Sequence, residues 1–195
     1  MHRLPNLITI LRLLLIAPTG ACILGGRPGL ALGLFVAAGV SDAVDGWLAR
    51  RFAWTSRFGA IADPLADKLL VAVVYVLLAV QGVLPAWLAA LVVLRDLIII
   101  GGALVYHLRV ERLEMAPTLL GKLNTLAHIL FVALVLASLT APSVAWLGAS
   151  VAPGVVLIAA LTLISGADYV RVWSARARGA ARERPVADAG RLEDV

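Results

Sequence analysis

The stretch SDAVDGWLARRFAWTSRFGAIADPLADK (residues 41–68) separates two strongly apolar runs and carries four aspartates: Asp42, Asp45, Asp63 and Asp67. The flanking runs, 30–40 and 69–80, are each too short to cross a bilayer, which takes about 20 residues. A spanning helix on either side must therefore include aspartates. Carboxylates in such helices are costly and indicate a functional site.

The spacing of the aspartates predicts a shared site. The two helices would form an antiparallel hairpin that turns near Trp54, with Asp45 opposite Asp63 and Asp42 nearly opposite Asp67. Asp42 and Asp45 are three residues apart, and Asp63 and Asp67 are four residues apart. The two aspartates of each helix therefore lie on one face of that helix. Four carboxylates that face one gap repel each other unless cations lie between them. Their oxygens suit hard divalent ions such as Mg²⁺, Mn²⁺ or Ca²⁺.

Two structural explanations compete with a metal site. Asp63 before Pro64 is typical of a helix N-cap followed by proline. The aspartates also have basic neighbours that can form interfacial ion pairs: Arg50, Arg51, Arg57 and Lys68. Neither explanation accounts for all four carboxylates on two facing stripes.

Composition places the chain in the polytopic membrane class, because 62% of its 195 residues are hydrophobic. The net charge of +5 is not a nucleic-acid signal, since no basic soluble domain accompanies it. The apolar runs predict an all-α fold with six transmembrane helices, at about 6–24, 30–50, 59–80, 86–107, 121–140 and 145–170. We expect a membrane domain over 1–170 and a basic cytosolic tail over 171–195 that is helical at first and frayed after Pro185.

Basic residues predict the orientation of these spans. Six spans put both termini on one side, and most of the 17 Lys and Arg residues fall on that side. Arg27 lies on the other, and Arg12, Lys68 and Arg95 lie within spans. By the positive-inside rule, the termini and the aspartate hairpin face the cytosol, and a bacterial inner membrane is the expected location.

The aspartate stretch resembles the signature of the CDP-alcohol phosphatidyltransferase family. It reads Asp42-x2-Asp45-Gly46-x2-Ala49-Arg50-x8-Gly59-x3-Asp63-x3-Asp67, with every position of the signature filled. The resemblance implies a six-helix homodimer that moves a phosphatidyl group from CDP-diacylglycerol to an alcohol and releases CMP.

The resemblance also implies roles for the signature residues. Asp42, Asp45, Asp63 and Asp67 match the ligands of one or two Mg²⁺ or Mn²⁺ ions, and Asp67 matches the general base. The CDP-binding residues are matched by Asp42, the remaining signature positions and Asn6 of the segment PNLITILR. The remaining positions are Gly46, Ala49, Arg50 and Gly59. Such ions neutralise a diphosphate and stabilise the leaving group.

The alcohol acceptor is predicted from two further segments. Arg95-Asp96 and Lys122-x-Asn124-Thr125 resemble the cardiolipin synthases, whereas phosphatidylglycerophosphate synthases more often have Arg-Glu and Lys-x-Lys-Thr. This favours phosphatidylglycerol over glycerol 3-phosphate. On charge complementarity, Arg95 and Lys122 are candidates for the acceptor phosphate. Arg95 as a simple partner of Asp96, and Lys122 as an interfacial anchor, are the competing explanations.

Two other function classes fit parts of the pattern. Intramembrane carboxylates also build divalent-cation transporters, and a non-catalytic scaffold is the third possibility. Neither explains Arg50 and Gly59 at fixed spacing. His128, in an apolar context, is expected to be a helix-packing histidine with satisfied hydrogen bonds.

Overall fold

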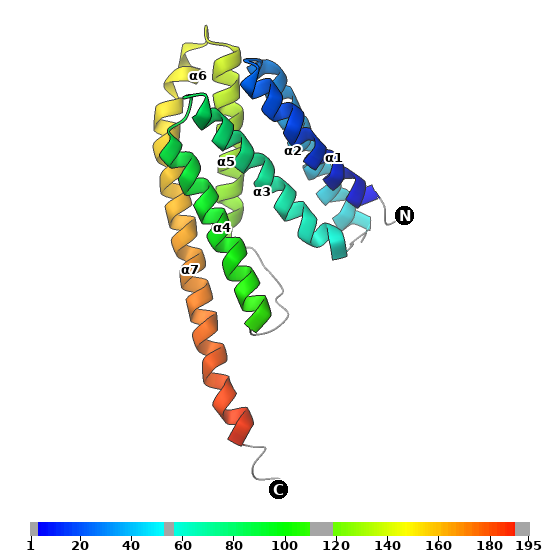
Figure 1. Cartoon of the computed structure of the whole chain (residues 1–195), viewed down its shortest axis with the longest axis vertical. Helices are drawn as coiled ribbons and strands as arrows, with labels where there is room; N and C mark the ends of the chain where they lie inside the picture. The colour runs from blue at the N-terminus through cyan, green and yellow to red at the C-terminus, as the bar shows by residue number, and fades with distance from the viewer. Residues whose placement is uncertain (1–3, 53–56, 110–118, 190–195) are drawn as a thin grey trace.

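The computed structural model is all-α, with helices that follow the apolar runs (Figure 1). The structure describes residues 4–52, 57–109 and 119–189. Within the helices, it describes side chains at 10–42, 44, 51, 68–102 and 119–171. The helices are α1 (Leu4–Leu24), α2 (Pro28–Phe52), α3 (Arg57–Val80), α4 (Ala86–Arg109), α5 (Leu119–Thr140), α6 (Ala145–Ala149) and α7 (Val151–Ala189).

Two glycine turns close the helix pairs at one end of the molecule. Gly26 and Gly82 have φ angles of 65° and 70°, a left-handed conformation that favours glycine. After α1, the Arg27 amide donates to the Cys22 carbonyl at 2.8 Å; after α3, the Val83 amide donates to the Leu78 carbonyl at 2.9 Å. These are Schellman caps, which satisfy the last carbonyls of a helix.

Gln81 fastens these two helix ends together. Its side-chain Nε2 donates to the carbonyl oxygens of Ile23 and Leu24, at 3.2 Å each. Both acceptors belong to the last turn of α1, where carbonyls lack helical partners. The C-terminal ends of α1 and α3 are therefore held side by side.

The core lies where α3 and α5 meet their neighbours. Val74, Leu78, Val132 and Leu136 are among its fully buried residues. Large apolar side chains cover much of the outer surface, for example Leu14 and Val156, which are 65% and 68% exposed. Broad exposed apolar surface marks contact with lipid or protein rather than water.

Two helical stretches among the described residues are long and apolar enough to cross a membrane, Leu119–Thr140 and Ala145–Arg171. Only 33% and 17% of their most apolar windows are buried, unlike the core helix of a soluble protein. Shorter apolar segments occur at Ile10–Leu24, Pro28–Asp42 and Lys68–Val80. The prediction of an all-α fold is confirmed, and the count of six spans stays a prediction.

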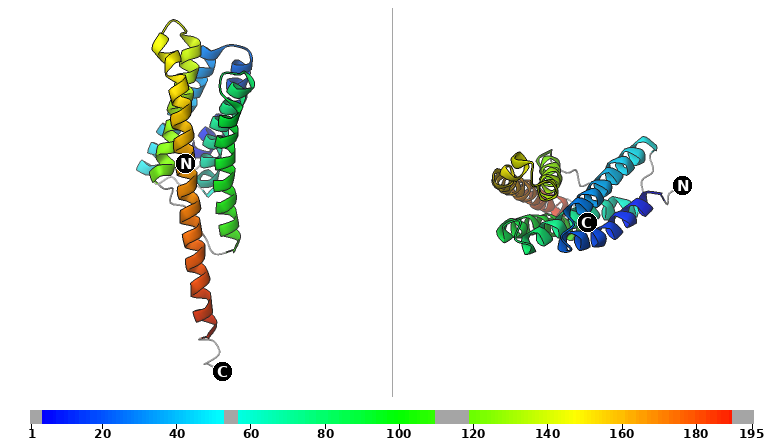
Figure 2. Two further views of the ribbon diagram at one scale, coloured as in Figure 1. Left: turned by 90° about the vertical axis from the view of Figure 1, so that its left-hand side faces the viewer. Right: turned by 90° about the horizontal axis from the view of Figure 1, so that it is seen from above.

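The last predicted helix differs from the structure at both ends. Instead of one helix over 145–170, α6 ends at Ala149 and α7 begins at Val151. Pro153 explains the break, because a proline ring conflicts with the carbonyl four residues earlier, here Ala149. The expected fraying after Pro185 is wrong, since α7 continues to Ala189. Two of the four helical residues after Pro185 are alanines, Ala187 and Ala189, which have high helix propensity. Figure 2 shows this end of α7 reaching well past the other helices.

Candidate functional site

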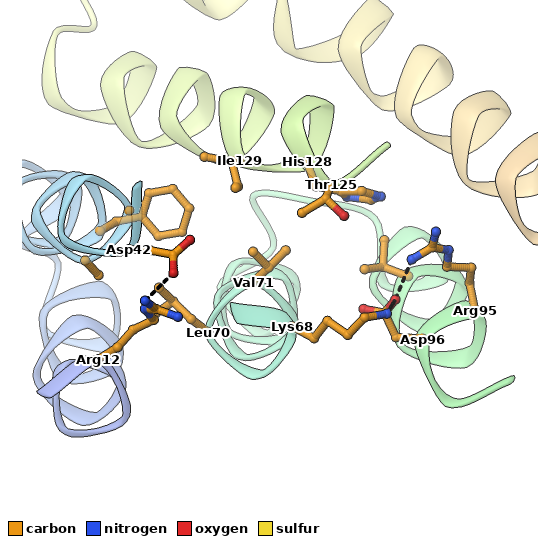
Figure 3. Close-up of a pocket in the computed structure, with 14 residues that line it drawn as sticks. Arg12, Asp42, Lys68, Leu70, Val71, Arg95, Asp96, Thr125, His128 and Ile129 are labelled. Atoms are coloured by element: carbon orange, nitrogen blue, oxygen red, sulfur yellow. Dashed lines mark hydrogen bonds and ion pairs between the residues drawn. The ribbon is translucent and has the colours of Figure 1, made fainter. Parts of the chain in front are cut away.

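A pocket of about 70 Å³ opens among α1, α2, α3, α4 and α5. Its lining includes Phe35 and Val71 but is notable for its charges, which come from four helices. Figure 3 shows these side chains grouped at two sides of the pocket, with Thr125 of α5 between them. The charged lining residues are Arg12, Asp42, Lys68, Arg95 and Asp96.

Arg12 and Asp42 form an ion pair at one side of the pocket. Arg12 Nη2 of α1 donates to Asp42 Oδ1 of α2. The Arg12 side chain is 1% exposed and that of Asp42 is 38% exposed, so the arginine is buried behind a carboxylate that faces the pocket (Figure 3). The pair fixes the first aspartate of the signature to α1.

A second charged cluster lies at the opposite side. Asp96 Oδ1 accepts from Lys68 Nζ of α3 and from Arg95 Nη1, both at 2.7 Å. Arg95 Nη2 donates to Ser165 Oγ of α7 at 2.7 Å, and the Arg95 guanidinium carbon lies 5.6 Å from the Tyr169 ring centroid. One carboxylate thus joins two cations, and the cluster links α3, α4 and α7.

His128 lies beside this cluster with both ring nitrogens engaged. Thr162 Oγ1 donates to the Ile158 carbonyl at 2.6 Å, so it must accept from His128 Nε2, at 3.1 Å. His128 Nδ1 is then an acceptor for the Tyr75 hydroxyl, at 2.8 Å. The expectation of a hydrogen-bonded packing histidine is confirmed.

The two candidates for the acceptor phosphate occupy different environments. Arg95 is 7% exposed and lines the pocket, whereas Lys122 is exposed and is not among the lining residues. Asn124 is 1% exposed, and neither polar atom of its amide has a hydrogen-bond partner among the described residues. Thr125, the next residue, lines the pocket.

Most signature residues have only their helix defined. Asn6 lies on α1, and the side chains of this and the other signature residues except Asp42 lie outside the described residues. The signature positions on α2 are Asp45, Gly46, Ala49 and Arg50, and those on α3 are Gly59, Asp63 and Asp67.

The relation between α2 and α3 is also defined only in part. Within the described part of the chain, both pack against α1 rather than against each other, and the pocket lies between them. Their predicted turn near Trp54 falls outside the described residues. The facing arrangement of the four carboxylates therefore stays a prediction.

The donor chemistry at Asp42 suits a hard divalent ion. A carboxylate has two oxygens and about four acceptor sites, and Arg12 engages Oδ1. Among the side chains that the structure describes, no three potential ligands cluster. A metal site here therefore requires the other aspartates of α2 and α3.

The sequence analysis did not assign three of the pocket residues to the site: Arg12, Lys68 and Asp96. Their signal was present, since each is a charge inside an otherwise apolar helix, and such charges pair or mark function. The expected pairing of Arg95 with Asp96 is confirmed. The pairs Arg12–Asp42 and Lys68–Asp96 could not be identified, because they span 30 and 28 residues of sequence.

The helices, the apolar surface and the charged pocket together define an all-helical protein of the membrane-bound class. The sequence profile of the CDP-alcohol phosphatidyltransferases matches residues 2–174, and the chain belongs to this family. The family expected from the aspartate signature is thereby confirmed. The family is generally metal-dependent.

The names of individual relatives differ. A probable cardiolipin synthase (CMP-forming) of Drosophila melanogaster is 34% identical over 138 residues, 63% of this chain and 43% of that protein. A probable phosphatidylglycerophosphate synthase of Mycobacterium tuberculosis is 34% identical over 176 residues, which are 86% of this chain and 79% of that protein. The CDP-diacylglycerol–glycerol-3-phosphate 3-phosphatidyltransferase of Bacillus subtilis is 35% identical over 144 residues, which are 73% of this chain and 72% of that protein. The chain spans half or less of the length of the animal cardiolipin synthases.

Proposed function

We propose that the chain transfers a phosphatidyl group from CDP-diacylglycerol to a glycerol-type alcohol and releases CMP. The acceptor hydroxyl oxygen forms a bond to the phosphorus that carries the diacylglycerol, the phosphoanhydride bond to CMP breaks, and Asp67 takes the hydroxyl proton. The observation that carries the proposal is Asp42, the first signature aspartate, in the wall of a pocket that also holds Lys68 and Arg95. Family membership supports this reaction over cation transport.

In this proposal, four aspartates hold one or two Mg²⁺ or Mn²⁺ ions: Asp42, Asp45, Asp63 and Asp67. When bound, the ions supply charge neutralisation for the diphosphate and for the departing CMP. Arg12 holds Asp42 in place from α1. A carboxylate beside the acceptor hydroxyl can take its proton, which is the role proposed for Asp67.

The proposed CDP-binding residues come from three helices. Gly46 and Ala49 leave room beside the nucleotide, Arg50 faces its cytidine or phosphates, and Gly59 permits close helix approach. Asn6 belongs to the same set. These roles follow the family signature.

We propose phosphatidylglycerol as the acceptor, which makes the activity that of a CMP-forming cardiolipin synthase. Asn124 supports this choice because its buried amide brings no second positive charge for a free glycerol phosphate. Glycerol 3-phosphate is the second candidate. It is favoured by the M. tuberculosis and B. subtilis relatives, of which the chain covers 79% and 72%.

We also propose six spans with the pocket at the cytosolic face, and a division into a membrane domain (1–170) and a basic tail (171–195). The positive-inside pattern supports the orientation, and the composition supports the division. α7 crosses residue 170 without interruption. A homodimer stays an expectation from the family.

The test is an assay of purified protein with CDP-diacylglycerol, Mg²⁺ or Mn²⁺, and each acceptor. We expect CMP release with phosphatidylglycerol and formation of cardiolipin. CMP release only with glycerol 3-phosphate would assign the second candidate, and none with either would refute the proposal.

Asp67→Asn should lower CMP release by about 100-fold or more, the contribution of a general base, while the protein stays folded in detergent. Wild-type turnover in that variant would refute the role of Asp67.

A further inference from the structure

The cluster of Lys68, Asp96 and Arg95 is not used by the signature aspartates, although it forms a side of the same pocket. Its three members differ in how far a ligand can reach them. The Lys68 side chain is 25% exposed, Asp96 is 16% exposed, and Arg95 is 7% exposed. Lys68 is therefore the accessible cation of the cluster.

The contacts of Arg95 indicate a supporting role. Its Nη1 is bound to Asp96 and its Nη2 to Ser165, while its plane lies over the Tyr169 ring. These contacts hold the guanidinium between α4 and α7. Arg95 in turn fixes the carboxylate of Asp96, which it contacts at 2.7 Å.

The contacts of Lys68 leave capacity for a ligand. An ammonium group has three donors, and one of them is directed to Asp96 Oδ1. Two cations share one carboxylate, so this side of the pocket carries one net positive charge. At the other side, Arg12 offsets the charge of Asp42. An anionic group entering the pocket is therefore drawn to Lys68.

We propose that Lys68 binds the phosphate of the acceptor, and that Asp96 and Arg95 are positioning residues that hold its ammonium at the pocket wall. The proposal rests on the proposed function and deepens it. It gives the contact with the acceptor phosphate to Lys68, in place of the buried Arg95 and the exposed Lys122. Lys68 directly follows Asp67 in the sequence, so the proposed phosphate contact and the proposed base belong to the same turn of α3.

The ligand class is a phosphate ester of glycerol, either the diester of phosphatidylglycerol or the monoester of glycerol 3-phosphate. Both present phosphate oxygens to an ammonium donor. Steady-state kinetics with each acceptor in separate arms distinguishes the two sources.

The experiment compares Lys68→Met, Lys68→Arg and Asp96→Asn with the wild type. Loss of a hydrogen bond to a charged group predicts that Lys68→Met raises the acceptor KM by about 10- to 100-fold. The KM for CDP-diacylglycerol should stay within about 2-fold. Lys68→Arg keeps the charge and should recover most of the acceptor affinity. Asp96→Asn keeps Lys68 but frees its ammonium, so a smaller rise in acceptor KM, about 3- to 10-fold, is expected.

Arg27→Met is the matched control, since Arg27 is an exposed cation in the turn between α1 and α2. It should leave both KM values unchanged. A purely structural role of Lys68 would lower kcat or the yield of folded protein and leave the acceptor KM unchanged.

Each outcome decides the proposal. An unchanged acceptor KM in Lys68→Met, or an equal rise in the KM of CDP-diacylglycerol, would overturn it. Lys122→Met is measured in parallel, and a rise in its acceptor KM with none for Lys68→Met would assign the phosphate to Lys122. If the wild type released no CMP with either acceptor, the proposed function itself would fail. If the wild type were active and the acceptor KM of the Lys68 variant were unchanged, only the role of Lys68 would fail. If Lys68→Met did not fold, Lys68→Arg and Asp96→Asn would still test the acceptor KM.

Discussion

The ion pair between Arg12 and Asp42 allows a quantitative test of how α1 holds the site. Arg12→Met keeps an apolar side chain of similar length but removes the donor to Asp42 Oδ1. A hydrogen bond to a charged group contributes about 1.5–3 kcal/mol. Because the Asp42 side chain is 38% exposed, water reduces this, and we expect about 1–2 kcal/mol for the pair.

The assay is a double-mutant cycle of thermal unfolding in detergent with EDTA, so that no divalent ion contributes. It uses Arg12→Met, Asp42→Asn and the double variant. Arg12 makes further interactions, so Arg12→Met alone lowers the free energy of unfolding by more than the ion pair contributes. Only the double-mutant cycle isolates the contribution of the ion pair. At about 2–4 °C per kcal/mol for a chain of this size, the pair corresponds to about 2–8 °C in Tm. Arg27→Met should leave Tm unchanged. Additive effects, with a coupling below about 0.5 kcal/mol, would refute the reasoning.

Three further predictions concern the core and the proposed metal. Tyr75→Phe removes the donor to His128 Nδ1 inside a fully buried contact, and should cost about 1–3 kcal/mol in thermal unfolding; no change would contradict a stabilising role of this hydrogen bond. Gly154→Ala places a Cβ in steric conflict with Cε2 of the buried Phe131. It should lower stability by about 1–2 kcal/mol, since overpacking exceeds the gain in helix propensity, and Phe131→Leu in the same chain should relieve the loss. Removal of divalent ions with EDTA should abolish CMP release, and Mg²⁺ or Mn²⁺ should restore it; full activity in EDTA would contradict the proposed metal role.

The sequence predicted most helices because each is a long apolar run between turn residues. It placed the α1–α2 turn at residues 25–28 and the α3–α4 turn at 81–85, where the structure has glycine caps at Gly26 and Gly82. It missed the break before α7, because the conflict of Pro153 with Ala149 is hidden inside an apolar run.

The sequence predicted the chemical kind of the candidate site but only part of the arrangement of its side chains. The aspartate spacing identified the family, since the signature is local. The Arg12–Asp42 and Lys68–Asp96 pairs were not predicted, because they depend on how α1, α3 and α4 pack. Helix packing angles do not follow from the periodicity of one helix.

The Gln81 contacts to Ile23 and Leu24 have a mechanical consequence for the pocket. They make the glycine-turn end a pivot for α1 and α3. Lys68 lies 13 residues before Gln81 on α3, or about 20 Å along the helix at 1.5 Å per residue. A swing of about 3° at the pivot would then shift Lys68 by about 1 Å relative to α1, about as much as separates a hydrogen bond from none. The distance between the joined helix ends and Lys68 thus makes the position of the proposed phosphate contact sensitive to the angle between α1 and α3.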